Sequence, residues 1–427
     1  MNNIKDFGAI GDGVTNDAKA VDAAIDACAA DGGGIVHFPP GRFLCGTIHL
    51  KNNITIDISP GAVVMIGDDD DIDVIEDYGY DTHADDETSF FNCALFRLDS
   101  VDNVCIKGGG TIDGNRPKRH GPKPISVKKC TRVTIRDLKI EHSPNYALSF
   151  IDSELIVVDN VWVEYSFADG IDFDGCRFVR MSNCRICSGD DAICLKSSPA
   201  LREPVDCAHI TVTNCHVLTS SNCFKFGTES GPGGFTDITI SNCTFEKQPL
   251  FRNPPGGICL ESVDGAIIDR IACSNITMNN VSCPIFLRLG NRGRAQDTPT
   301  PGILQNVSIS NIVATNAEMP CIISGIPGFN IKNVSIHDVM IEYGQAAKLH
   351  VEASVEPSDV PEEEEKYPDP RMFGELPAWA FYSRHAENVQ VKNVQSRIAG
   401  SLAALKPAVL LDDVDRSSIV IDEYRIE

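Results

Sequence analysis

Short runs of alternating apolar and polar residues recur along most of the 427-residue chain. A form Asn-Val/Ile-x-Ile, followed by a polar turn and a second apolar run, returns in "HITVTNCHV", "DITISNCTF", "NVSISNIVA" and "NVSIHDVMI". Successive runs are roughly 20 to 30 residues apart, and units of this size bury their apolar side only by stacking. The alternation therefore predicts an all-β fold, a right-handed parallel β-helix (solenoid), with residues 1–427 as a single β-helix domain. A propeller or sandwich fits less well, because two-residue hairpin turns do not recur.

One segment near the start has helical spacing instead. In "NDAKAVDAAIDACAADGGG", Asn16 is a candidate N-cap, and Val21, Ile25 and Cys28 follow at i, i+4 and i+7. The glycines at 32–34 end the pattern. We expect a short N-terminal capping helix over the first strands, since the terminal units of a solenoid need a cover.

Composition narrows the possible partners. Asp and Glu number 60 against 37 Lys and Arg, a net charge of −23, which argues against a nucleic-acid partner. No apolar run is long enough to span a membrane, and the first residues lack a signal-peptide pattern. Most of the 17 cysteines lie inside strand-like runs, which favours free thiols. We expect a cytoplasmic protein, or a secreted or periplasmic one if a signal segment has been removed, and the composition leaves the oligomeric state open.

Two acidic stretches interrupt the repeat. Residues 68–87 carry eleven acids and read as a solvated loop, with a calcium site as the less favoured interpretation. Residues 345–378 form an acidic, Pro/Glu-rich insertion. It is either a disordered spacer or a segment whose aromatic end, with Tyr367, Phe373 and Trp379, docks as the wall of a substrate cleft.

Acidic residues cluster where neighbouring strands begin. Asp169 and the pair Asp190–Asp191 fall just before strands on consecutive turns of the solenoid, so we expect their carboxylates to meet. Aligning the inward residues places Asp172, Lys225 and Arg288 in one outward column. A carboxyl that stays protonated beside one that stays ionised is the pairing that glycoside hydrolysis needs. The alternative is a set of ordinary solvated side chains on the outside of the coil.

These segments also resemble a known family. "SPNYALSF", "ADGIDFDGC" and "SGDDAICLKS", in that order, and "KDFGAIGDGVTNDAKAVDAAIDACAADGGGIVHFPPGRF" near the start, resemble the family 28 glycoside hydrolases, the polygalacturonase family. The resemblance covers about residues 4–340. It implies a right-handed β-helix and metal-free hydrolysis with inversion, without a cofactor. It further implies Asp190 as general acid, with Asp169 and Asp191 activating water; acid and base are then expected about 6.5–9.5 Å apart.

Two motifs of the family are missing here. Ser220, Ser221 and Asn222 stand where a Gly-His-Gly is expected, so Ser221 replaces the histidine. Cys259, Leu260 and Glu261 stand where an Arg-Ile-Lys should bind the substrate carboxylate, and we expect Glu261 to repel a uronate. We nominate for substrate binding the polar residues Asp172, Lys196, Ser221, Lys225, Glu229, Glu261, Arg288, Arg384 and His385, with Arg384 and His385 as candidate substitutes for the histidine.

The favoured function is an inverting glycoside hydrolase that cleaves a plant or algal polysaccharide or oligosaccharide of pectin type. Because the carboxylate-binding motif is missing, we do not expect plain homogalacturonan as its preferred substrate. One alternative is a β-helix polysaccharide lyase or epimerase acting on uronates, with the acids holding Ca²⁺ and Lys196 or Lys225 as base. Another is a non-catalytic glycan-binding β-helix.

Overall fold

The computed structural model describes residues 1–203, 205–249, 251–344, 355–399 and 406–426. The fold is a right-handed parallel β-helix with a capping helix near its N-terminus, as the alternation predicted. The residues group into two compact units: residues 1–190 with 200–215 (unit 1), and residues 191–199 with 216–427 (unit 2). That residues 1–427 behave as a single domain stays a prediction.

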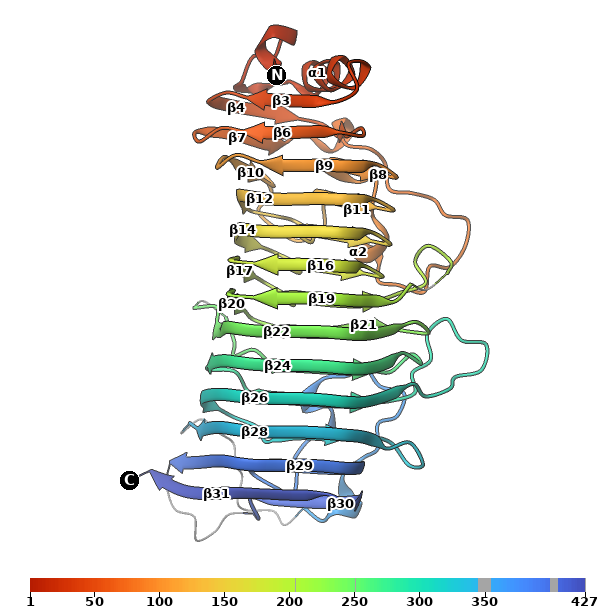
Figure 1. Ribbon diagram of the computed structural model, residues 1–427, viewed down its shortest axis with the longest axis vertical. Coiled ribbons are helices and arrows are strands. Elements are labelled where there is room, and N and C mark those ends of the chain that lie inside the picture. The colour runs from red at the N-terminus through yellow and green to blue at the C-terminus, as the bar shows by residue number, and fades with distance from the viewer. Residues whose placement is uncertain (204, 250, 345–354, 400–405, 427) are drawn as a thin grey trace. The chain divides into compact units, whose positions relative to one another are not determined.

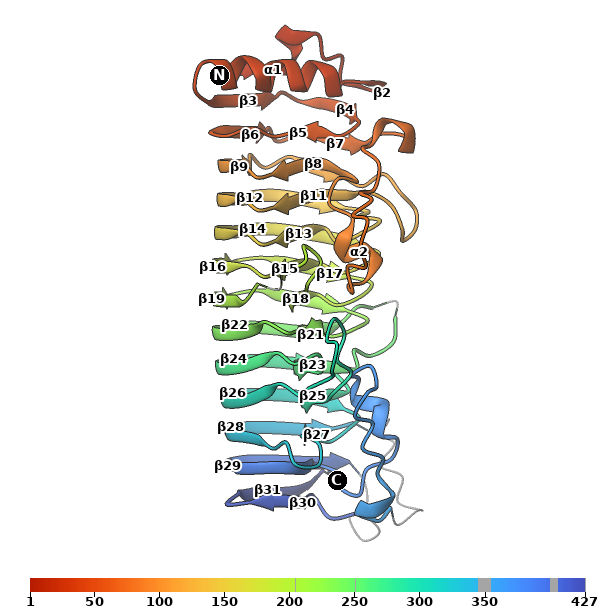
Figure 2. The ribbon, with the colours of Figure 1, turned by 90° about the vertical axis from the view of Figure 1, so that its right-hand side faces the viewer.

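Unit 1 contains three rows of parallel strands, of which the first is labelled in Figure 1 and the third in Figure 2. The first row consists of β1 (Asn2–Asn3), β3 (Gly34–Phe38), β6 (Ile54–Ile58), β9 (Asp102–Lys107), β12 (Thr131–Glu141), β14 (Glu154–Ser166), β16 (Arg177–Ser182) and β19 (Cys207–Thr213). The second consists of β2 (Asp12–Asn16), β4 (Gly41–Cys45), β7 (Ala62–Ile66), β10 (Thr111–Asp113) and β17 (Arg185–Ser188), together with the far ends of β12 and β14. The third consists of β5 (Ile48–His49), β8 (Ala94–Asp99), β11 (Lys123–Lys128), β13 (Leu148–Ile151) and β15 (Ile171–Asp174).

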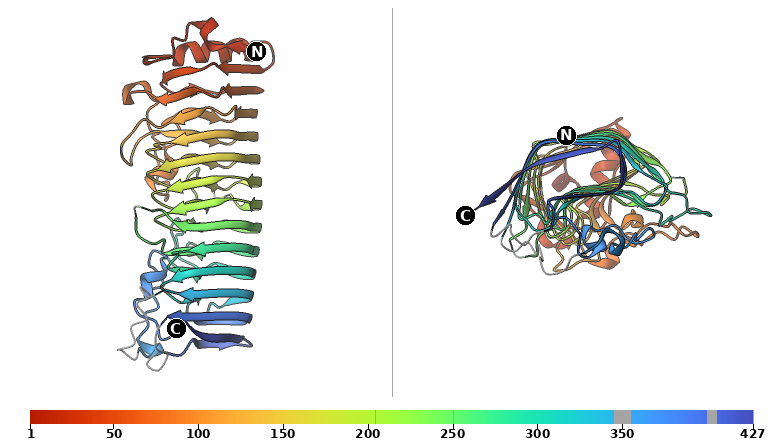
Figure 3. Two further views of the ribbon diagram at one scale, coloured as in Figure 1. Left: turned by 90° about the vertical axis from the view of Figure 1, so that its left-hand side faces the viewer. Right: turned by 90° about the horizontal axis from the view of Figure 1, so that it is seen from below.

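Unit 2 has the same construction, and its strands turn around a common interior when seen from below (Figure 3). Its first row consists of β22 (Gly234–Lys247), β24 (Ile267–Asn279), β26 (Ile303–Ala317), β28 (Ile331–Tyr343), β29 (Phe381–Ala399) and β31 (Ser418–Ile426), and β20 (His216–Thr219) pairs with the far end of β22. Its third row consists of β18 (Ile193–Ser197), β21 (Phe224–Ser230), β23 (Gly256–Ser262), β25 (Cys283–Leu289), β27 (Cys321–Ser324), the start of β29, and β30 (Val409–Asp415).

The repeating residues of the sequence explain this stacking. The inward apolar positions lie in register on successive strands and are almost fully buried, as in Ile238, Ile271, Val307 and Val334. Asn242, Asn275 and Asn311 each turn the chain with a positive φ, a conformation that Asn tolerates better than most residues. The Nδ2 of Asn275 donates to the Oδ1 of Asn242, and the Nδ2 of Asn311 donates to the Oδ1 of Asn275, each at 3.0 Å. Apolar stacking and asparagine stacking therefore fix the register together.

The predicted capping helix is α1 (Ala18–Ala30), which buries Val21, Ile25 and Cys28. Asn16 accepts a hydrogen bond from the backbone of Ala18, although the N-cap position itself is Asp17. In Figure 3 the helix lies above the first strands of unit 1. The described part of the chain also has a second, four-residue helix, α2 (Asp86–Ser89), and 3₁₀ turns at Ile4–Phe7, Asp69–Asp71, Pro357–Asp359 and Pro370–Phe373.

All 17 cysteines are free thiols, and 15 of them are buried, as their positions inside strands predicted. Burial raises the pKa of several, including Cys176 and Cys259, so these thiols stay protonated and pack as small apolar groups. Among the described residues, we found no helix with the length and apolar character needed to cross a membrane.

Three strands of the third row of unit 2, β21, β23 and β25, are buried on both faces, and part of the acidic insertion packs on the outer side of β23 and β25. Residues 345–354 of that insertion lie outside the described residues. Val360, Phe373, Leu376 and Ala378 pack in one apolar cluster with Cys259, Cys283, Phe286, Ile322 and Tyr382 of the strands. The described end of the insertion therefore docks on the coil, and its role as the wall of a substrate cleft stays a prediction.

Candidate active site

Asp169 and Asp190 meet in unit 1 because they lie on turns stacked one above the other. Asp169 precedes β15 and Asp190 follows β17, and the backbone N–H of Asp190 donates to the carbonyl of Ala168 at 3.2 Å. Ser166 and Ser188 fix the two turns by donating to the carbonyls of Asp169 and Asp190 at 2.8 and 2.6 Å. Carboxylate oxygens of the two aspartates lie within 4.8 Å of each other. The expected separation of about 6.5–9.5 Å refers to the whole carboxyl groups of acid and base rather than to their nearest oxygens, and it stays a prediction.

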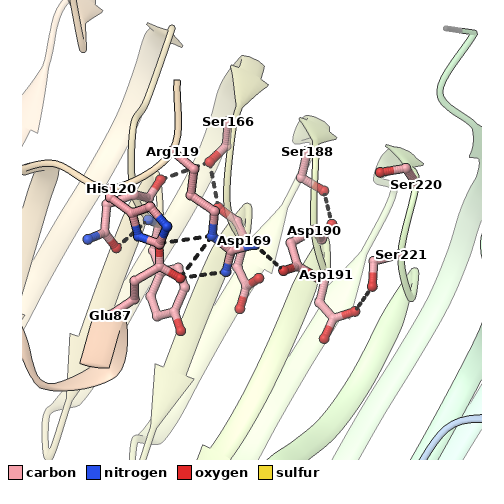
Figure 4. A network of polar contacts seen from close by, with 12 residues as sticks. Glu87, Arg119, His120, Ser166, Asp169, Ser188, Asp190, Asp191, Ser220 and Ser221 are labelled. Carbon is pink, nitrogen blue, oxygen red and sulfur yellow. Dashed lines mark hydrogen bonds and ion pairs between the residues drawn. The ribbon is translucent and has the colours of Figure 1, made fainter. Parts of the chain in front are cut away.

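Asp190 is also bound to a cation that the sequence did not single out. Arg119, in the loop between β10 and β11, donates from Nη1 to Asp190 Oδ2 at 2.5 Å (Figure 4). Its Nε and Nη2 donate to the carboxylate of Glu87, which belongs to α2. The side chain of Glu87 is 9% exposed, that of Asp190 32% and that of Arg119 37%. Residues 68–87, which the sequence indicated to be a solvated loop, therefore end at the site with Glu87. No motif or regular spacing in the sequence indicated that Glu87 or Arg119 belongs to the site.

Asp191 is the residue after Asp190 and belongs to unit 2, where donors surround its carboxylate. Ser221 Oγ donates to Oδ1 at 2.6 Å, a contact drawn in Figure 4, and the backbone N–H and Nδ2 of Asn222 donate to the same oxygen at 2.8 Å each. The Lys225 ammonium lies 3.0 Å from Oδ2. Burial alone raises the pKa of Asp191, but Lys225 and the hydrogen bonds outweigh it and leave the pKa below its usual value. Asp191 is therefore held ionised, and Ser221, in place of the family's histidine, contributes to holding it.

Lys225 connects Asp191 to the insertion. Its side chain is fully buried, and its ammonium donates to the hydroxyl of Tyr367 at 2.9 Å and lies 5.0 Å from the centre of that ring. Burial lowers the pKa of this lysine, but Asp191 and Glu261 reverse the effect and keep it charged. Because the ammonium is enclosed between Asp191 and Tyr367, it reaches a substrate only if Tyr367 moves away.

The environment of Glu261 disfavours a charged carboxylate. Its side chain is fully buried, its nearest cation is Lys225 at 3.9 Å, and neither carboxylate oxygen has a hydrogen-bond partner among the described residues. Burial raises the pKa of Glu261 to about 8 although Lys225 acts to lower it. A pKa raised in this way favours the protonated carboxyl at neutral pH, and the expectation that Glu261 repels a uronate stays a prediction.

Arg288 is not in the column where the alignment placed it. Ile285 pairs with Ile258, so Phe286 faces Cys259 and Arg288 faces Glu261. The misplacement came from aligning Leu287 instead of Ile285, which has the same inward orientation two residues earlier. Arg288 is fully buried and donates to Ser324, to the carbonyl of Gly325 and to the carbonyls of residues 362 and 363. In this arrangement it holds the insertion rather than a substrate.

Arg384 and His385 contact the same insertion. Arg384 Nη1 donates to the carbonyl of Val360 at 2.8 Å, and its guanidinium pairs with Glu362 and Asp412. His385 Nδ1 lies 2.7 Å from Asp413, and Nε2 lies 3.2 Å from Glu362. Both side chains are nearly buried by these partners. Their contacts attach the insertion to β29, and a role in place of the missing histidine stays a prediction.

The remaining nominated residues are buried polar groups on the third row of strands. Lys196 on β18 and Glu229 on β21 face each other in unit 2 at 3.7 Å, and Arg294 lies 3.8 Å from Glu229. Asp172 is on β15 in unit 1, where it pairs with Ser149 of β13. Elsewhere in unit 1, Asp113, Glu141 and His142 bring three possible metal-ligand atoms within 4.8 Å. Lys139 already pairs with Glu141 there, at 2.5 Å, and His142 with Asp113, at 3.1 Å.

The chain is similar in sequence and in structure to known polygalacturonases. The sequence model of Glycosyl hydrolases family 28 matches residues 71–358. A "Probable polygalacturonase" of Vitis vinifera is 25% identical over 370 residues, which cover 78% of this chain and 73% of that protein. The crystal structure of a hyperthermoactive exopolygalacturonase from Thermotoga maritima matches with a TM-score of 0.67 and 22% identity, over 80% of this chain and 87% of that chain.

A shorter segment of the chain is similar in sequence to another class of enzyme, the mannuronan epimerases. Mannuronan C5-epimerase AlgE5 of Azotobacter vinelandii is 34% identical over 151 residues, which are 32% of this chain and 14% of the epimerase. This similarity is limited to one segment, whereas the family model covers residues on both sides of the paired aspartates.

Proposed function

The chain belongs to glycosyl hydrolases family 28, the family of polygalacturonases, and is a glycosidase; on that premise we propose that it hydrolyses a pectin-type polysaccharide or oligosaccharide with inversion. Asp190 is the proposed general acid, and Asp169 and Asp191 act on the attacking water. The proposal needs no metal, because the two proton-transfer roles fall on carboxyl groups.

The observation that carries the proposal is the unequal environment of the paired aspartates. Asp191 is buried and kept ionised by Lys225, Ser221 and Asn222. Asp190 keeps about a third of its side chain exposed and lies against Asp169. Neighbouring carboxyls in different environments take different roles, which glycoside hydrolysis requires.

The proposed chemistry follows from these environments. Asp190 gives its proton to the glycosidic oxygen as the bond between that oxygen and the anomeric carbon breaks. A water molecule attacks the anomeric carbon, and Asp169 takes the proton that the water loses. Asp191, whose charge is fixed, orients the water and stabilises the positive charge that develops on the sugar ring. Asp169 then releases its proton to solvent, and solvent supplies a proton to Asp190.

The substrate is expected to differ from plain homogalacturonan. Cys259 and Glu261, which stand where the family's carboxylate-binding motif is expected, are both fully buried. Cys259 packs against apolar residues of the insertion, and Glu261 is mostly neutral. Neither residue can supply the charge-assisted contact of an arginine or lysine. A substrate with a neutral sugar on this side, or with a uronate bound by another cation, fits the site better.

A product assay separates the candidate activities. The purified protein is incubated with polygalacturonate, rhamnogalacturonan oligosaccharides and mannuronan, with and without a chelator. We expect new reducing ends from a mixed uronate and neutral-sugar substrate, unchanged by the chelator and without the absorbance of an unsaturated sugar. Unsaturated products would indicate a lyase. A change at C5 without chain cleavage would indicate the epimerase reaction that the similarity over 151 residues raises.

A further inference from the structure

The cations nominated from the sequence for a substrate carboxylate are enclosed by protein. Lys225 and Arg288 are fully buried, and Lys196 is 3% exposed. Arg119, by contrast, is 37% exposed and lies in direct contact with Asp190 in unit 1. A cation that is accessible and touches the proposed general acid is placed to contact the sugar on which that acid acts.

Glu87 fixes the orientation of this arginine. It accepts hydrogen bonds from Nε at 3.0 and 3.1 Å and from Nη2, so it occupies the side edge of the guanidinium. The helix that carries Glu87 is itself held, since Tyr78 donates to the carbonyl of Ser89 at 3.1 Å and Thr88 lies 3.3 Å from the hydroxyl of Tyr146. The end edge of the guanidinium, with Nη1, is left directed at Asp190.

We propose that Arg119 is a specificity-determining residue that binds the carboxylate of a uronic acid unit of the substrate, with Glu87 as its positioning residue. This inference rests on the proposed function and deepens it. A guanidinium edge matches a carboxylate with two parallel hydrogen bonds, a contact that neutral sugars cannot make.

The charge of Asp190 decides when Arg119 is available. Ionised Asp190 pairs with Nη1 and competes with a substrate carboxylate. The general acid must be protonated to act, and a neutral carboxyl no longer competes for the cation. The uronate and the proton on Asp190 are therefore expected to favour each other.

Equilibrium binding tests the proposal without relying on turnover. In an Asp190→Asn background, which imitates the neutral acid, calorimetry measures the Kd of an oligosaccharide of alternating uronic acid and neutral sugar and of its carboxyl-reduced counterpart. We expect Asp190→Asn to bind the charged oligosaccharide more tightly than the parent protein does, and Arg119→Gln to weaken that binding by at least about tenfold, the loss of one charge-assisted contact. Binding of the reduced oligosaccharide should not change.

Two further variants guard the interpretation. Arg116→Gln changes an arginine of the same loop that pairs with Asp69, and it should leave both Kd values unchanged. Arg119→Lys keeps the positive charge but lacks the two parallel donors of a guanidinium, so it should weaken binding less than Arg119→Gln. This variant provides the comparison if Arg119→Gln folds poorly. Equal weakening of charged and reduced oligosaccharides by Arg119→Gln, or no weakening of either, overturns the proposal. Failure of the parent protein to release reducing ends would instead count against the proposed function, because the binding assay needs no hydrolysis.

Discussion

The Lys225 ammonium lies 3.0 Å from Asp191 Oδ2 in unit 2, with the lysine fully buried and the aspartate side chain 8% exposed. A buried ion pair of this kind is costly to break, because removing one partner leaves the other charged and desolvated. It also sets the chemistry of the site. A negative charge held by Lys225 is fixed in place before a substrate arrives, and the lysine is in turn covered by Tyr367.

Lys225→Met should lower the free energy of unfolding by about 3–5 kcal/mol, since it leaves Asp191 without its cation. Urea denaturation at neutral pH measures the loss. Lys366→Met is the matched control, because that lysine is 61% exposed and pairs only at the surface with Glu363. The control should change stability by no more than about 0.5 kcal/mol. Equal effects of the two substitutions would contradict the role given to the buried pair.

Glu261 predicts a distinct dependence of stability on pH. Its pKa is about 8 in the folded protein against 4.5 for an ordinary glutamate, so between these values the folded state holds a proton that the unfolded state has lost. Stability from this group is complete below about pH 4.5 and declines as the pH rises toward 8, with a slope of at most about 1.4 kcal/mol per pH unit. The difference in unfolding free energy between the parent and Glu261→Gln, measured from pH 5 to 9, should show this decline. A difference that does not vary with pH would mean that the carboxyl is ionised throughout.

The spacing of apolar residues was sufficient to predict the fold, the capping helix and the buried thiols. In a β-helix the inward apolar positions recur at every second residue of each strand, and in the capping helix they recur at helical spacing. The spacing also predicted that Asp169 and Asp190 meet. It failed at Arg288, since two inward residues of one strand, Ile285 and Leu287, fit an alignment equally well. It gave no signal for Glu87 and Arg119, which lie outside the repeat and reach Asp190 through loops whose course no periodicity describes.

The burial of Glu261 could not be predicted from the sequence either. An outward position on a coil is expected to face solvent, and Glu261 was read as a charged group for that reason. The insertion packs on Cys259, which lies on the same outward face of β23 as Glu261, and burial there raises the pKa of Glu261. The aromatic residues Tyr367 and Phe373 were the available sign that the insertion docks.

The stereochemistry of the reaction is open to a direct test. The roles proposed for Asp169 and Asp190 require inversion at the anomeric carbon, with room for a water molecule between acid and base. We expect inversion, because Asp169 is the proposed base for the attacking water and the charge of Asp191 is held in place by Lys225. Proton NMR of freshly released product should show the inverted anomer first. Initial appearance of the retained anomer would show that one of these aspartates is a nucleophile.

The turnover of Asp190→Asn tests most directly whether Asp190 donates the proton that cleaves the glycosidic bond. Asparagine keeps the shape of the side chain and cannot donate that proton, so reducing-end release should fall by about 10²–10⁴-fold while the unfolding midpoint stays close to that of the parent. Asp297→Asn, at an exposed position of unit 2, is the control and should retain full activity. Turnover by Asp190→Asn within about threefold of the parent would contradict the account, since the loss of a general acid has a far larger effect.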